Sequence, residues 1–82
     1  HAQSAYDYYY RGSIKFASRD YQGAIADLNK AIEMNPENEF AYRTRGIAKE
    51  LVGDLKGACA DWRKASSLGV QDAAGWVRDQ CQ

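Results

Sequence analysis

The chain has 82 residues, of which 45% are hydrophobic and 27% are charged, and this composition fits one globular domain and argues against disorder. Eleven basic residues balance eleven acidic ones, so no net field attracts nucleic acid or anionic lipid. Apolar stretches are only a few residues long, whereas a membrane helix needs ~20. We therefore expect no membrane partner and rank nucleic acid as the weakest class of partner.

Capping and turn signals predict five helices. Ser4, followed by Asp7 three residues later, is typical of a helix start, and this first helix is expected to run to about Ser18. Pro36 ends the second helix because the residue before a proline disfavours helical geometry. The later helices are expected from Tyr21 to about Asn35, from Asn38 to Gly53, from Asp54 to Gly69 and from Asp72 onward, with Asp20, Asn38, Asp54 and Asp72 as caps.

The main signal is an internal repeat with a period of 34 residues. A shift by this period aligns residues 5–38 with residues 39–72 and gives eleven identities. The identical residues are Tyr8, Arg11, Gly12, Lys15, Asp20, Gly23, Ala24, Ala26, Asp27, Lys30 and Ala31, each with its counterpart 34 positions later. Self-similarity at this period predicts stacked structural units.

These residues resemble the tetratricopeptide repeat. The family pattern is met by Tyr8, Gly12, Ala24, Leu28, Ala31 and Pro36 in the first unit and by Tyr42, Gly46, Ala58, Trp62 and Ala65 in the second. The resemblance implies an all-α fold, an α-solenoid of two antiparallel helical hairpins, residues 5–38 and 39–72, with a capping helix over residues 72–82. The whole chain, residues 1–82, would then be one domain.

The chain departs from this pattern inside each hairpin. Arg11 and Arg45 stand where the family has leucine, and an aspartate, Asp27 or Asp61, lies at the same helix-pair contact. An unpaired buried charge is costly, so we predict that Arg11 pairs with Asp27 and Arg45 with Asp61. The alternative is that each arginine extends along the surface to solvent.

The resemblance also implies a concave wall, formed by the first helix of each unit, that binds an extended peptide or a partner helix. The predicted groove residues are Tyr6, Tyr9, Ser13, Phe16, Arg43, Ile47, Glu50 and Arg78. The wider wall would add Ala17, Phe40, Leu51, Ala74, Val77 and Cys81. We therefore predict a non-catalytic protein-interaction scaffold with an unidentified protein or peptide partner.

Two alternatives concern the partner. Some members of the family hold acidic carboxyl tails of heat-shock chaperones with lysine, asparagine and arginine. Here Tyr9, Ser13, Thr44 and Ala74 occupy four of those places and only Arg78 matches, which favours an amphipathic ligand instead. The other alternative is a homo-oligomer, in which the surplus tyrosines of the first helix meet another copy and complete the solenoid.

Catalytic and metal chemistry are not expected. The only histidine is His1, so the usual proton shuttle is missing, and the glutamates near residue 37 lack the spacing of a calcium loop. We predict no cofactor and no metal site. Because the chain begins with His1 rather than methionine, we interpret it as a piece of a longer chain and make no prediction about its compartment.

Three hypotheses remain for the two cysteines, Cys59 and Cys81. They could be buried free thiols that pack as small apolar residues, a disulfide that ties down the closing helix, or a reactive redox pair. We favour the buried thiols.

Overall fold

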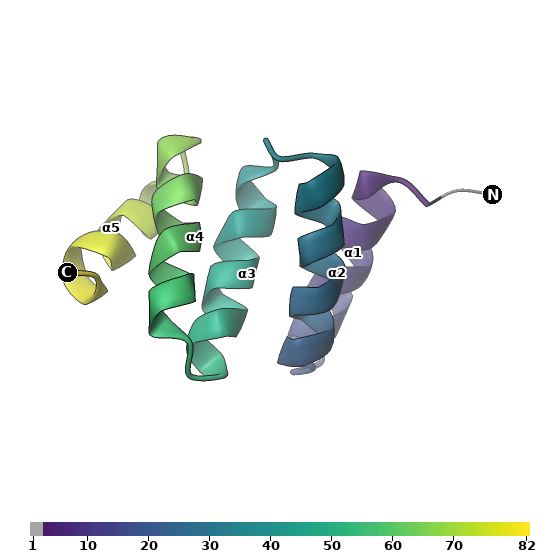
Figure 1. Ribbon diagram of the computed structural model, residues 1–82, viewed down its shortest axis with the longest axis horizontal. Coiled ribbons are helices and arrows are strands. Elements are labelled where there is room, and N and C mark those ends of the chain that lie inside the picture. Colours follow the sequence, from purple (N-terminus) through teal and green to yellow (C-terminus); the bar gives the residue numbers. More distant parts are fainter. Residues whose placement is uncertain (1–2) are drawn as a thin grey trace.

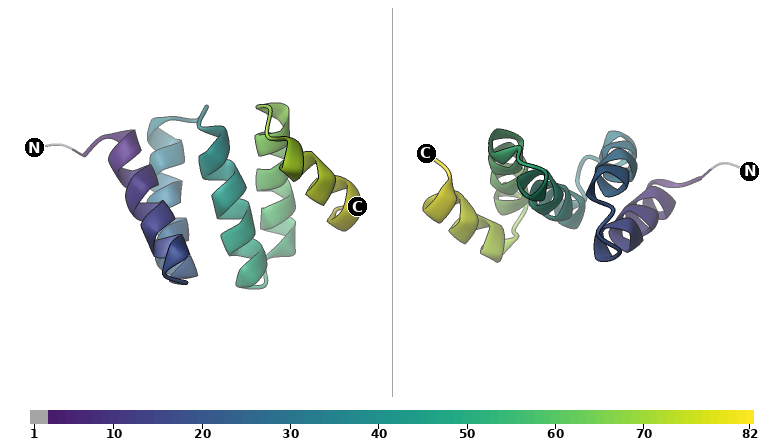
Figure 2. Two further views of the ribbon diagram at one scale, coloured as in Figure 1. Left: turned by 180° about the vertical axis from the view of Figure 1, so that it is seen from behind. Right: turned by 90° about the horizontal axis from the view of Figure 1, so that it is seen from below.

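The computed structural model describes residues 3–82. They form five helices, α1 (Ala5–Ala17), α2 (Tyr21–Met34), α3 (Glu39–Leu51), α4 (Leu55–Ser67) and α5 (Gln71–Gln80), with no strand among these residues. Successive helices pack against each other, so that α1, α3 and α5 form one layer and α2 and α4 the other (Figures 1 and 2). The predicted all-α solenoid is confirmed. No helix within residues 3–82 has the length and apolar character to span a membrane.

Side-chain caps begin the first four helices. Ser4 accepts a hydrogen bond from the Asp7 backbone N–H at 3.1 Å, and the Asp7 carboxylate accepts one from the Ser4 backbone N–H at 3.0 Å. Asp20 and Asp54 each accept a backbone hydrogen bond at 2.9 Å, and Asn38 caps α3. These bonds satisfy N–H groups that a helix start leaves without partners, and the four caps agree with the prediction.

The predicted cap at Asp72 is wrong. Helix α5 begins at Gln71, and Val70, which precedes it, makes no side-chain cap bond. Gly69 has φ +106°, a left-handed conformation that glycine adopts without the steric cost of a side chain. The chain therefore turns sharply after α4, and α5 runs obliquely to α3 and α4 (Figure 2). Asp72 lies one residue inside the helix, where its carboxylate binds α3 instead.

Glycine permits close contact between the two helices of each hairpin. A Cβ on Gly12 would lie 2.9 Å from Leu28 Cγ, and a Cβ on Gly46 would lie 2.6 Å from both Cδ1 and Nε1 of Trp62. Trp62 is only 1% exposed, so its ring has no free space into which it could move. Gly12 and Gly46 are thus explained by the closeness of the paired helices.

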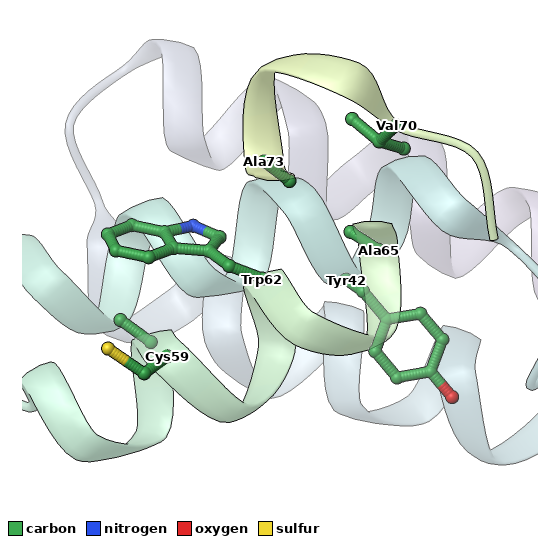
Figure 3. Close-up of a cluster of buried hydrophobic side chains, with 7 residues drawn as sticks. Tyr42, Cys59, Trp62, Ala65, Val70 and Ala73 are labelled. Atoms are coloured by element: carbon green, nitrogen blue, oxygen red, sulfur yellow. The ribbon is translucent and has the colours of Figure 1, made fainter. Parts of the chain in front are cut away.

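The buried side chains form two clusters. The first hairpin contributes Ala24 and Leu28, which pack with Ala41 of α3. The second cluster lies around Trp62 and includes Tyr42, Ala58, Cys59, Ala65, Val70 and Ala73 (Figure 3). Trp76 of α5 packs on Trp62 with ring centroids 5.3 Å apart. Helix α5 therefore covers the apolar face of the second hairpin.

Substitution of Gly46 by alanine tests the close contact. We expect Gly46→Ala to lower the free energy of unfolding by about 1–3 kcal/mol, because the added methyl group collides with the buried Trp62 ring. Gly75→Ala is the control, since a Cβ there meets only Arg78 Nη2 at 3.5 Å. It should raise stability by up to about 1 kcal/mol through helix propensity. Urea titration of both variants measures the difference, and equal stability of the two would contradict the packing argument.

Candidate functional site

The seam of the first hairpin, where α1 meets α2, contains one nearly buried carboxylate between two cations. Arg11 donates from Nε and Nη2 to the two oxygens of Asp27, both at 2.9 Å. Lys15 Nζ lies 3.0 Å from Asp27 Oδ2. The hydrogen bond from Arg11 lowers the pKa of Asp27, against a partial desolvation that raises it. The predicted bidentate pair is confirmed.

The seam of the second hairpin repeats this arrangement more deeply. Arg45 donates from Nε and Nη2 to Asp61 at 2.8 and 2.6 Å, and Lys49 Nζ lies 3.3 Å from Asp61 Oδ2. Arg45 Nη1 also donates to Asn29 Oδ1 at 2.9 Å, which links this seam to α2 of the first hairpin. The predicted pair of Arg45 with Asp61 is thus confirmed, and the same arginine also helps to hold the two hairpins together.

The role of the two lysines was not predicted from the sequence. Lys15 and Lys49 recur with the period of 34 and lie four residues after Arg11 and Arg45. Residues four apart share one face of a helix, so this spacing was a usable signal that both cations face the same carboxylate. As a consequence, all four of these cations bind aspartates of their own hairpins.

The tyrosine-rich part of α1 is largely exposed. Tyr6 is 66% exposed, and its ring stacks on that of Tyr10 with centroids 6.1 Å apart. The ring centroids of Tyr9 and Tyr6 are 6.3 Å apart. Tyr9 is partly buried and packs against the first core cluster. The Ser13 hydroxyl donates to the Tyr9 carbonyl oxygen at 2.9 Å. Tyr6 and Tyr10 are therefore the accessible aromatics, while Tyr9 and Ser13 belong partly to the scaffold.

The other residues predicted for the groove and the wider wall also divide into half-buried and exposed side chains. Phe16 is half-buried against the first core cluster and meets the edge of the Tyr21 ring at 5.6 Å. Ile47 and Glu50 are half-buried on α3. By contrast, Phe40 is 52% exposed and Leu51 is 53% exposed. The exposed apolar area of α3 thus lies at its two ends.

Arg43 is engaged within the protein. It donates from Nη2 to Asp72 Oδ2 at 2.8 Å and from Nε to both carboxylate oxygens at 3.1 and 3.2 Å. Its guanidinium carbon also lies 5.2 Å from the centroid of the Trp76 ring, a cation–π contact. The hydrogen bond from Arg43 lowers the pKa of Asp72. Arg43 thereby fastens the start of α5 to α3, and an anionic ligand would have to compete with Asp72 for it.

A hollow of about 530 Å³, the α3–α5 hollow, lies beside this ion pair. It is lined by Glu39, Phe40, Arg43, Leu68, Gly69, Val70, Gln71 and Asp72. Arg78, the remaining predicted cation, has a side chain that is 75% exposed, with Nε 3.4 Å from Asp79 Oδ1. The eight predicted groove residues are therefore spread over three helices, and of these only Arg43 lines the hollow, together with Phe40 of the wider wall.

The favoured hypothesis of two free thiols is wrong, because Cys59 and Cys81 form a disulfide. The end of α5 therefore lies beside α4, where Cys59 is 6% exposed. Cys81, which we expected on the concave wall, is therefore bonded to α4. The sequence could not decide this, because pairing depends on the angle between the two helices. Residues 3–82 hold no group of three histidine, cysteine, aspartate or glutamate side chains that could bind a metal ion.

Comparison with known proteins finds matches to a repeat family and to a curated protein. Residues 5–38 match the family described as the tetratricopeptide repeat. The Protein STIP1 homolog of Dictyostelium discoideum is 29% identical over 78 residues, which are 95% of this chain and 14% of that protein. The chain thus spans only a small part of the length of this relative. No solved structure matches the chain significantly.

Substitution of the two seam aspartates tests their contribution to stability. We expect Asp61→Asn to lower the free energy of unfolding by about 3–5 kcal/mol, because it leaves Arg45 and Lys49 as uncompensated charges. The matched variant Asp27→Asn should cost less, since the Arg11 side chain is 44% exposed and that of Arg45 only 15%. Thermal and urea unfolding of both variants give the comparison. A larger loss for Asp27→Asn would contradict the difference in burial.

Proposed function

We propose that this chain, whose residues 5–38 match the tetratricopeptide repeat, is a protein-interaction module that binds a partner segment on its concave wall. Proteins of this repeat family are typically non-catalytic. The concave wall comprises the outward faces of α1, α3 and α5. The exposure of large apolar side chains there carries the proposal, since Tyr6, Phe40 and Leu51 are each more than half exposed. Such side chains gain about 1.5–3 kcal/mol each when fully buried.

The charges around the wall favour an amphipathic segment over an acidic one. The four seam cations bind Asp27 and Asp61, and Arg43 binds Asp72. Glu50 adds a negative charge to the middle of the wall, and Arg78 a positive charge beside Asp79. A ligand would therefore gain most from apolar anchors against the aromatic side chains and little from carboxylates.

The predicted groove residues take two roles in this proposal. Tyr6 and Tyr9 would contact the ligand, because a tyrosine buries a large area at low entropic cost and keeps a polar end. Ser13, Phe16 and Ile47 would shape the floor of the wall from half-buried positions. Phe40 and Tyr10 should be added to the contact set because of their exposure.

The proposal can be tested with peptides selected from a random library against the intact domain. We expect neutral or basic peptides with apolar residues at helical spacing, and the double variant Tyr6→Ser with Phe40→Ser should weaken their binding by about tenfold or more. Both residues are exposed, so the fold should be kept, which circular dichroism checks. Arg43 is left unchanged because it fastens α5.

A matched control uses exposed apolar residues of the other layer. Met34 is 46% exposed and Leu55 is 45% exposed, and they lie on α2 and α4. The double variant Met34→Ser with Leu55→Ser should change binding by less than about twofold, as surface changes outside an interface do. Equal losses in the two double variants, or selection of acidic peptides alone, would argue against the proposed wall.

Self-association is a second candidate function, favoured by the uncovered edge of α1. Ile14 is 48% exposed, whereas Ala48, its counterpart 34 residues later, is fully buried. Tyr6 and Tyr10 continue this apolar row at a spacing of four residues. If copies associate here, light scattering should show a mass that rises with concentration, and Ile14→Asp should return it to that of a monomer. A constant monomer mass would exclude this function.

A further inference from the structure

A second hollow opens on the Cys59–Cys81 disulfide. This disulfide hollow has a volume of about 320 Å³ and is lined by Leu55, Lys56, Cys59 and Arg63 of α4 and by Gln80, Cys81 and Gln82 at the end of the described chain. Cys59 is 6% exposed, and Cys81 is half-buried. The hollow therefore gives a small molecule access to the bridge, and access is greater on the Cys81 side.

Two cations flank the bridge on the same face of α4. Lys56 precedes Cys59 by three residues and Arg63 follows it by four, so the three side chains are neighbours on the helix surface. Both cations are exposed, and within residues 3–82 neither has an aspartate or glutamate carboxylate within ion-pair distance. Arg63 Nη2 donates only to the Gln82 carbonyl oxygen, at 3.2 Å. Neither Lys56 nor Arg63 is thus paired with an acidic side chain of residues 3–82, and Lys56 brings a positive charge to the disulfide hollow.

We propose that this hollow is a site of thiol–disulfide exchange, in which a small thiol that carries carboxylate groups attacks Cys81. Cations without an acidic side-chain partner attract such a thiol and its thiolate. They also stabilise the thiolate that leaves from Cys59, and a leaving thiol of lower proton affinity leaves faster. The geometry thus supplies access on the Cys81 side and charge on the Cys59 side.

The incoming thiol is the only reductant that this exchange needs. A thiolate RS⁻ forms a bond to Cys81 Sγ while the bond between the two cysteine sulfurs breaks, and Cys59 Sγ leaves with the electron pair. Water then protonates the Cys59 thiolate. A second RS⁻ attacks the sulfur of the first thiol, which releases RSSR and the Cys81 thiolate. Water protonates this thiolate too, and the two protons are those that the two RSH lost on forming RS⁻. Overall, two thiols are oxidised and the bridge accepts two electrons and two protons.

Cleavage would free one end of α5 only. The start of the helix stays attached to α3 through Arg43 and Asp72, and Val70 and Ala73 stay buried in the core. The disulfide joins the opposite end of α5 to α4. After the exchange, α5 therefore stays attached to α3 at its start, and its end is no longer bonded to α4.

Reduction rates with thiols of different charge test the proposal on the intact, oxidised chain. The series is 3-mercaptopropionate, 2-mercaptoethanol and cysteamine, which are anionic, neutral and cationic, with each rate corrected for the reactivity expected from the pKa of the thiol. At low salt we expect the anionic thiol to react about threefold to tenfold faster than the cationic one. The difference should shrink toward unity at 1 M salt, where screening is strong.

A charge variant and a matched control locate the effect. Lys56→Gln with Arg63→Gln should abolish the preference for the anionic thiol. Arg19→Gln with Lys30→Gln, which removes the same charge elsewhere on the surface, should keep it. The proposal is overturned if the oxidised chain shows no charge preference, if both double variants behave alike, or if titration of the native chain finds two free thiols.

Trapping of the first adduct tests the point of attack. After a short reaction with 3-mercaptopropionate, an acid quench and alkylation, peptide mass spectrometry should find the thiol on Cys81 and the alkyl group on Cys59. The reverse pattern, or equal labelling of both cysteines, would overturn the assignment of Cys81 as the attacked sulfur. The same mapping on urea-unfolded chain should give no preference, because there the two sulfurs are equally accessible.

Discussion

A buried carboxylate held between two cations fixes each hairpin of this protein. Asp27 and Asp61 are nearly inaccessible to water, and a buried charge without partners would cost several kcal/mol. An arginine fork and a lysine from the facing helix supply the partners. Aspartate has a short side chain, so this contact requires the helices to lie close together. The glycine and alanine residues of the seam provide that closeness, and the ion pairs and the small residues therefore depend on each other.

This use of the cations limits what the proposed concave wall could offer a ligand. Arg11, Lys15, Arg45 and Lys49 are directed into the seams, and Arg43 is directed to the cap. The wall keeps exposed aromatic and aliphatic side chains instead. Electrostatic recognition of an acidic ligand would need cations that are free to pair with it. Apolar contact is thus the main source of binding free energy that the wall can supply.

Helix α5 differs from the first helix of a repeat because its two ends are attached in different ways. An ion pair with cation–π support holds its start to α3, and a disulfide holds its end to α4. The first attachment responds to protonation of a carboxylate and the second to thiols. The apolar contact between Trp62 and Trp76 lies between them. Helix α5 is therefore held by apolar packing at its centre, by an ion pair at its start and by a disulfide at its end.

The sequence alone determined the five helices and the period of 34 residues, because both follow from spacing along the chain. The arginine–aspartate pairs were predicted from the departures of each hairpin from the repeat pattern. Capping residues act within one turn, and residues that recur at a fixed period must occupy equivalent places in stacked units. Only the tertiary structure decided the roles of Arg43, Asp72, Cys59 and Cys81. All four depend on the direction of α5, which the short turn around Gly69 and the packing of Trp76 on Trp62 set together. No local pattern encodes the angle between two helices, and that angle placed Asp72 on Arg43 and Cys81 on Cys59.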